Sequence, residues 1–131
     1  MLDEKTTVSE LKSLLQKFCD ERDWGKFHTA KDLAIGVVTE GSELLEPFRF
    51  LSLEQQEELL KDPERRLALG DELADVLFFI LRFSQRFDFD ISQHFFRKMK
   101  KNAAKYPVEA FRGKNHKSTL SVSDDRAQGS P

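Results

Sequence analysis

The chain has 131 residues, which is the usual size of one domain, and its formal net charge is −2. Charged residues make up 34% of it, but Leu and Phe are plentiful, so the composition excludes disorder for most of the length. The nearly balanced charge gives the whole molecule no attraction to nucleic acid or to a membrane, and we expect neither as a partner.

The N-terminus and the cysteine content predict a cytoplasmic protein. The first residues, Met1–Lys5, lack the apolar run of a signal peptide. The longest apolar stretch, Val76–Leu81, is far shorter than the ~20 residues that cross a bilayer. Cys19 is the single cysteine and cannot form an internal disulfide, which fits a reducing compartment.

Apolar residues recur at steps of three and four from the start of the chain. This spacing predicts a first helix over about 8–22, which Thr7 and Glu10 begin as a capping box. A loop over 23–28 follows. Thr29 then caps a second helix, which we expect to kink or end near Pro47 because proline cannot donate a backbone hydrogen bond.

The second half of the chain continues the helical pattern. Ser52 with Gln55 suggests a short helix, and Asp62-Pro63 begins a long one over about 63–87. Asp90 begins a further helix that we expect to end near Lys105, before Tyr106-Pro107. No alternation of Val, Ile and Thr indicates a strand. The predicted fold class is all-α, a bundle of four to five helices.

Composition changes after residue 112. From Gly113 the chain is rich in Lys, Asn, Ser, Asp and Gln, with few side chains that could be buried. We therefore predict an all-α domain over 1–112 and a flexible polar tail over 113–131. The alternative is that the tail docks on a neighbouring subunit.

The helix over 63–87 is apolar on almost every face. Such a helix must be buried on all sides, and one small domain cannot surround it, so we expect a homodimer or a dimer of dimers. A monomeric mass by light scattering would contradict this. The apolar side chains concerned are Leu67, Leu69, Leu73, Val76, Leu77, Phe78, Phe79, Ile80, Leu81 and Phe83.

Two carboxylate pairs lie inside these apolar helices. Glu40 with Glu43, and Glu72 with Asp75, are spaced three apart, so each pair projects from one helical face. Neither pair has a Lys or Arg one turn away on its own helix. Small neighbours such as Gly36, Gly41 and Gly70 are expected to let the two helices approach closely.

If the two pairs face each other, their four charges must either take up protons or bind cations. Oxygen ligands favour hard ions, so the pattern predicts Mg²⁺, with Mn²⁺ as a substitute. The alternative is that each pair is simply part of a solvated helix face, where such spacing is common.

A basic stripe and an aromatic loop suggest contacts to a nucleotide. Lys98, Asn102 and Lys105 lie on one stripe of the last helix, followed by Tyr106, and this set could cradle a polyphosphate. The alternative is a solvated basic face near a helix C-terminus.

Aromatic side chains gather before the second helix and after Pro47. Trp24, His28 and, beyond the kink, Phe50 could stack on a base. The alternative is that they plug the end of the bundle, and this is what we expect of Phe27.

Taken in order, these residues resemble the MazG-type all-α nucleoside triphosphate pyrophosphohydrolases, closest to the single-domain, dCTP pyrophosphatase-like branch. The resemblance covers about Leu11 to Pro107. It depends on Arg22-Asp23-Trp24, Phe27-His28, Glu40-Gly41-Ser42-Glu43-Leu44-Leu45-Glu46, Asp71-Glu72-Leu73-Ala74-Asp75-Val76-Leu77, Lys98-Met99, Asn102 and Lys105-Tyr106-Pro107.

The resemblance implies a helical dimer or tetramer that hydrolyses a nucleoside triphosphate to monophosphate and pyrophosphate. It implies that Glu40, Glu43, Glu72 and Asp75 hold Mg²⁺. We expect these carboxylates to act in catalysis, and we choose Glu43 as the one that orients or deprotonates the attacking water. It further implies that Lys98, Asn102 and Tyr106 contact phosphate or sugar, and that Trp24 and His28 line the base pocket. The chain departs from the family pattern in having Phe50 where Trp is common, Leu15 where the dCTP-specific branch often has His, and Pro47. The preferred base therefore stays open.

A second hypothesis is a helical interaction module without enzymatic activity. Its basic helix would bind an acidic partner, with salt-sensitive affinity and no need for a divalent ion.

Overall fold

The structure is a computed structural model that describes residues 1–119. The chain divides into two compact units, Met1–Phe89 and Asp90–Pro131, which are described separately below. Within the described residues, all regular elements are helical and no strand occurs, so the predicted all-α class is confirmed. Among the described residues, no helix combines the length and the hydrophobicity that a membrane span requires.

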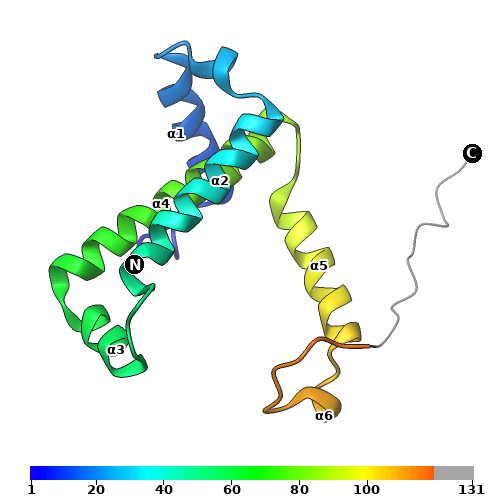
Figure 1. Cartoon of the computed structure of the whole chain (residues 1–131). Coiled ribbons are helices and arrows are strands. Elements are labelled where there is room, and N and C mark those ends of the chain that lie inside the picture. Colours follow the sequence, from blue (N-terminus) through cyan, green and yellow to red (C-terminus); the bar gives the residue numbers. More distant parts are fainter. Residues whose placement is uncertain (120–131) are drawn as a thin grey trace, which may run out of the picture. The chain divides into compact units, whose positions relative to one another are not determined.

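The first unit holds four α-helices and two short 3₁₀ turns (Figure 1). They are α1 (Val8–Asp20), η1 (Trp24–Phe27), α2 (Ala30–Leu45), η2 (Glu46–Phe48), α3 (Leu53–Lys61) and α4 (Pro63–Arg86). The second unit holds α5 (Ile91–Lys105) and the single-turn α6 (Val108–Phe111).

The helices begin at the caps that the sequence predicts. The Thr7 hydroxyl accepts from the backbone N–H of Glu10 at 3.2 Å, and the Glu10 carboxylate accepts from the backbone N–H of Thr7 at 2.6 Å. Ser52 and Gln55 form a second capping box. Asp62, the residue before Pro63, accepts the backbone N–H groups of Glu64 and Arg65. Each cap satisfies donors that a helix N-terminus leaves free.

The ends and the shortest elements differ from the prediction. Helix α1 ends at Asp20, two residues before the predicted end at about Arg22, and the expected loop over 23–28 contains η1. Helix α2 ends at Leu45, close to the predicted break, and Pro47 occupies η2. Helix α6 is an element that the sequence pattern did not predict. The predicted boundary between a domain over 1–112 and a tail stays a prediction, since residues 120–131 lie outside the described part.

The core of the first unit forms where α1 and α2 pack on α4. Leu15, Cys19 and Leu81 are buried together, with Leu11 and Phe78 against them. On the other side α2 runs along α4 (Figure 1). There Gly36 is buried, and a Cβ at this position would overlap the ring of Phe79. The expectation of a close approach holds at Gly36 but is wrong for Gly41 and Gly70, which have nothing described within 4 Å of an added Cβ.

Gly36→Ala should therefore lower the free energy of unfolding by about 1–3 kcal/mol, because the added methyl group would overpack the contact between α2 and α4. Gly70→Ala is the matched control in α4, where the gain in helix propensity should leave stability unchanged or about 0.5–1 kcal/mol higher. Urea denaturation measures both variants, and equal stability of the two proteins would contradict the close approach.

This chain alone does not bury α4 on all sides. Its apolar residues Leu67, Leu73 and Leu77 are each at least 42% exposed, although Leu69 and Leu81 are buried. The apolar pattern of this helix predicts a subunit partner, and the exposed side chains are the surface that such a partner would cover.

Candidate active site

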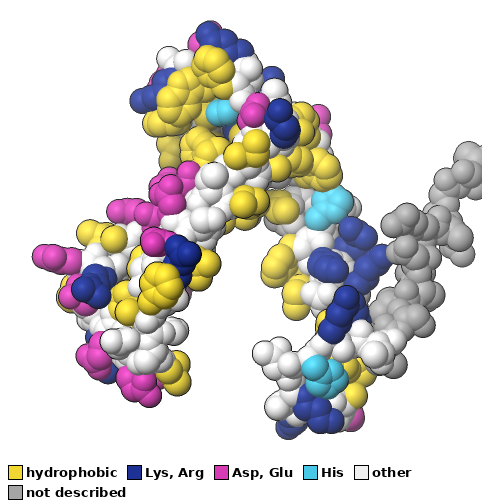
Figure 2. Space-filling view, viewed as in Figure 1, with side chains coloured by type: hydrophobic (Ala, Val, Ile, Leu, Met, Phe, Trp, Pro, Cys, Tyr) yellow, Lys and Arg dark blue, Asp and Glu magenta, His cyan; other side chains and the backbone are white. Residues whose placement is uncertain are grey.

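Three carboxylates from two helices converge where α2 lies against α4. Glu40 and Glu43 of α2 and Glu72 of α4 each place one oxygen within 4.8 Å of the others. Figure 2 shows acidic side chains gathered along this part of the first unit. Asp75 is not one of the three, but its charge acts on Glu40. The packing thus joins carboxylates that lie about 30 positions apart in the sequence.

The electrostatics of the cluster favour a bound cation. Burial, and then the charges of Glu43, Asp75 and Glu72, raise the pKa of Glu40 above its ordinary value of 4.5. One carboxylate oxygen of Glu72, Oε2, is buried and has no hydrogen-bond partner within the described chain. A buried acceptor without a donor is unfavourable, and a cation would satisfy it and offset the repulsion. The oxygen ligands of Glu40, Glu43 and Glu72 therefore fit a divalent metal ion.

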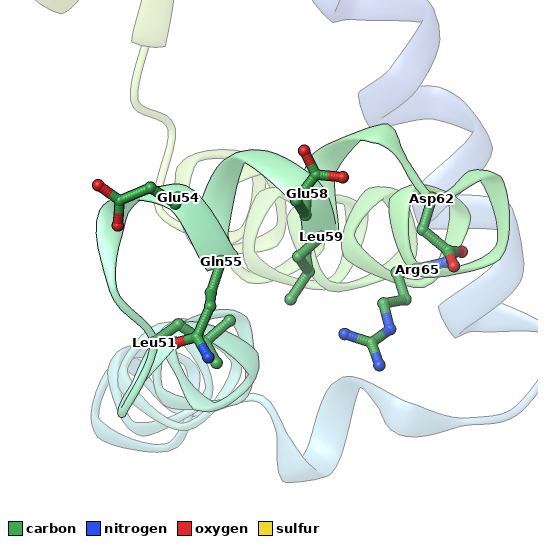
Figure 3. Close-up of a pocket in the computed structure, with 7 residues that line it drawn as sticks. All are labelled: Leu51, Glu54, Gln55, Glu58, Leu59, Asp62 and Arg65. Atoms are coloured by element: carbon green, nitrogen blue, oxygen red, sulfur yellow. The ribbon is translucent and has the colours of Figure 1, made fainter.

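A groove beside Glu72 adds a cation that the sequence analysis missed. Glu72 lines a groove of about 300 Å³ together with Pro47 of η2, Leu59 of α3 and Arg65, Ala68 and Leu69 of α4. Leu59 and Arg65 also line a neighbouring groove of about 440 Å³, from whose wall the Arg65 side chain projects (Figure 3). Arg65 precedes Glu72 by seven residues, which is two helical turns on the same face. This spacing is the feature of the sequence that could have indicated Arg65 as a cation near Glu72.

The aromatic loop is partly packed and partly exposed. The Trp24 ring lies edge-on to Phe18, with centroids 5.5 Å apart, and edge-on to His28 at 6.4 Å. Phe27 is 61% exposed, so the expectation that it plugs the end of the bundle is wrong in this chain. Phe50 is 86% exposed and lies under the Arg49 guanidinium. Trp24 and His28 thus share one small surface, whereas Phe50 is not packed against them within the described chain.

His28 is held by a buried arginine that the sequence analysis did not single out. Arg82 of α4 is only 4% exposed, and its Nε donates to Nδ1 of His28 at 3.0 Å. Burial, and then the charges of Arg82 and Arg86, lower the pKa of His28 below its ordinary 6.5. The signal in the sequence was a charged residue inside the apolar run from Val76 to Phe83, although its partner could not be foreseen.

The predicted phosphate-binding residues lie in the second unit. Lys98, Asn102 and Lys105 belong to α5, and Tyr106 follows as its C-cap. The Tyr106 ring packs edge-on against Phe111 at 5.1 Å, and the Lys105 ammonium lies over it at 5.7 Å. Tyr106 also lines a groove with Lys114, His116 and Lys117. The contact of these residues with a nucleotide stays a prediction.

Comparison with known proteins gives one consistent result. A family model described as the MazG-like family matches residues 36–119. The mouse dCTP pyrophosphatase 1 is 33% identical over 127 residues, an alignment that covers 94% of this chain and 75% of that protein; the human protein of the same name is 31% identical with the same coverage. The crystal structure of a pyrophosphatase from Archaeoglobus fulgidus matches with a TM-score of 0.71 and 37% identity, over 76% of this chain and 91% of that one.

Proposed function

We infer the substrate and the metal ion from the fact that this chain belongs to the MazG-like family and is a nucleotide pyrophosphohydrolase. The resemblance noted in the sequence is confirmed. We propose that the enzyme hydrolyses the α–β phosphoanhydride of a nucleoside or deoxynucleoside triphosphate, with dCTP or a modified nucleotide as the candidate substrate. The products are the monophosphate and pyrophosphate, and the role is the removal of surplus or non-standard nucleotides.

The convergence of Glu40, Glu43 and Glu72 around a buried, unpartnered oxygen is the observation that carries this proposal. These three carboxylates, with Asp75 beside them, would hold Mg²⁺, and Mn²⁺ could replace it. When bound, the ion neutralises negative charge on the triphosphate oxygens. Glu43 is the exposed member of the three, which supports its proposed role of orienting or deprotonating the attacking water.

We also propose roles in nucleotide binding for cations and aromatic rings of each unit. Lys98, Lys105 and Tyr106 stabilise the departing pyrophosphate, and Asn102 contacts phosphate or sugar. Arg65, in the groove that Glu72 lines, is a further cation for the triphosphate. Trp24 and His28 bind the base, and Phe50 is the exposed aromatic residue available to stack on it.

This chain departs from the dCTP-specific pattern at a position that bears on base preference. Leu15, at the position where that branch often has His, is buried against Cys19 and Leu81. Its apolar side chain offers no hydrogen bond to a base. Cytosine selectivity, if present, must therefore come from other residues.

We also propose a homodimer or homotetramer in the cytoplasm. The exposed Leu67, Leu73 and Leu77 on α4 support the assembly, because apolar side chains on one helix are a surface for another subunit. The mass in solution by light scattering should be a multiple of the 15.2 kDa chain mass, and a monomer at micromolar concentration would refute the assembly.

A nucleotide panel tests the function directly. The full chain is incubated with the common ribo- and deoxyribonucleoside triphosphates, the diphosphates and 5-methyl-dCTP, with Mg²⁺ or with EDTA. We expect monophosphate and pyrophosphate from at least one triphosphate with Mg²⁺ and no product with EDTA. Salt-sensitive binding of polyanions without hydrolysis of any nucleotide would instead favour the interaction module.

A further inference from the structure

We propose that Arg82 is a positioning residue for base recognition, which holds Nδ1 of His28 as a hydrogen-bond acceptor so that His28 presents its Nε2–H to the nucleotide base as a donor. The inference rests on the proposed function, since that function places a base at His28.

The hydrogen bond determines which nitrogen of His28 carries the proton. Arg82 Nε donates to Nδ1 across 3.0 Å, and a guanidinium cannot accept a hydrogen bond. Nδ1 must therefore be unprotonated. A neutral imidazole has one N–H, so that proton lies on Nε2.

The surroundings keep His28 in this neutral form. Burial, and the positive charges of Arg82 and Arg86, act together to lower the pKa of His28, so a second proton is disfavoured at neutral pH. Within residues 1–119, Nε2 of His28 has no hydrogen-bond partner. The ring thus has one nitrogen held by the protein and one N–H free for a ligand.

Arg82 is anchored in a way that fits a positioning role. Its Nη1 donates to Gln85 at 2.6 Å, and the Gln85 amide donates to the Lys12 carbonyl at 2.9 Å and to the Gln16 side chain at 3.1 Å. A chain of hydrogen bonds therefore runs from α1 through α4 to the loop that carries His28.

Stability alone does not explain this arginine. Arg82 is buried, and among the described residues no carboxylate lies within ion-pair distance of its guanidinium. A buried charge without a counter-ion is unfavourable for folding, so an apolar residue of similar volume would be the more stable choice. The guanidinium provides the hydrogen bonds to His28 and Gln85, which an apolar side chain could not make.

The orientation defines the class of group that the site recognises. An Nε2–H can donate but cannot accept, so it fits a ring carbonyl or an unprotonated ring nitrogen of a base. An exocyclic amino group at the same position would place two donors against each other. Discrimination of this kind arises because the mismatched pair leaves buried polar groups unsatisfied.

NMR of the full chain labelled with ¹⁵N-histidine tests the assignment without turnover. Loss of a signal in His28→Gln identifies His28 among the three histidines. We expect the wild-type protein at neutral pH to show the Nε2-protonated tautomer, and Arg82→Met to convert His28 to a mixture of tautomers. Arg82→Lys, which keeps a cationic donor, should restore most of the wild-type signal.

Arg86→Met is the matched control for the charge. Arg86 also lowers the pKa of His28, but it donates to the Gly25 carbonyl at 3.2 Å and not to His28. Its loss should leave the Nε2-protonated tautomer in place. An Nδ1-protonated ring in the wild type would overturn the inference even if Arg82→Met failed to fold.

Kinetics tests the role in recognition. Arg82→Met should raise KM for the preferred nucleotide about tenfold and leave kcat within about twofold, because a base contact remote from the cleaved bond contributes binding in the ground and transition states alike. A wild-type protein that hydrolyses no nucleotide would refute the proposed function and this recognition role together. An unchanged His28 tautomer in an active Arg82→Met enzyme would refute the role of Arg82 alone.

Discussion

Glu72→Gln should lower kcat by about 10³-fold, and Asp75→Asn should have a comparable effect. Glu72 supplies the buried oxygen that has no partner within the described chain, and its charge is part of the field at Glu40. Replacing a charged oxygen by an amide removes the strongest ligand type for a hard cation. The negative charges of the triphosphate and of the remaining carboxylates would then repel each other, because no cation would neutralise them. Steady-state pyrophosphate release measures the loss.

The same variants should keep their fold. Removing one of several repelling carboxylates relieves repulsion, so the helical CD signal should be unchanged and the melting temperature Tm should not fall in the absence of metal. Glu64→Gln, an equal charge change in the first turn of α4 and outside the cluster, is the matched control and should retain wild-type turnover. Undiminished activity in both Glu72→Gln and Asp75→Asn would refute the assignment of the site.

Saturating Mg²⁺ should raise Tm by roughly 5–10 °C at pH 7, and EDTA should reverse the change. In the proposed site the ion would bind the folded chain at Glu40, Glu43 and Glu72, which lie close together only after α2 packs on α4. A ligand at about 100 times its Kd adds about 2.7 kcal/mol to the free energy of unfolding. Thermal unfolding followed by CD, with and without Mg²⁺, measures the shift.

The rise in Tm that Mg²⁺ causes should be smaller at acidic pH. The pKa of Glu40 is raised in the folded state, so without metal the folded chain binds this proton more tightly than the unfolded chain. Stability without metal therefore falls as pH rises from the ordinary value of 4.5 through the raised value. In that window protons compete with Mg²⁺, and the metal-dependent increment should be smaller at pH 5 than at pH 7. An increment of equal size in Glu72→Gln and in the wild type would contradict binding at this cluster.

Local signals in the sequence were sufficient for most of the helices. Two helix starts illustrate this, Thr7 with Glu10 and Asp62 with Pro63. Each acts through hydrogen bonds and backbone angles within three residues, so it can be recognised in the sequence without knowledge of the fold. The single turns η1 and α6 were not foreseen because one turn carries too little periodicity to stand out.

The sequence by itself determined that Glu40 with Glu43, and Glu72 with Asp75, share a helical face, because a helix turns through 3.6 residues whatever surrounds it. Only the tertiary structure decided that Glu72 meets the pair on α2, that Gly36 and not Gly41 contacts α4, and that Arg82 reaches His28 across 54 positions. These contacts depend on how two helices are rotated and shifted against each other. That relation is set by the packing of many side chains together, and no spacing along one helix encodes it.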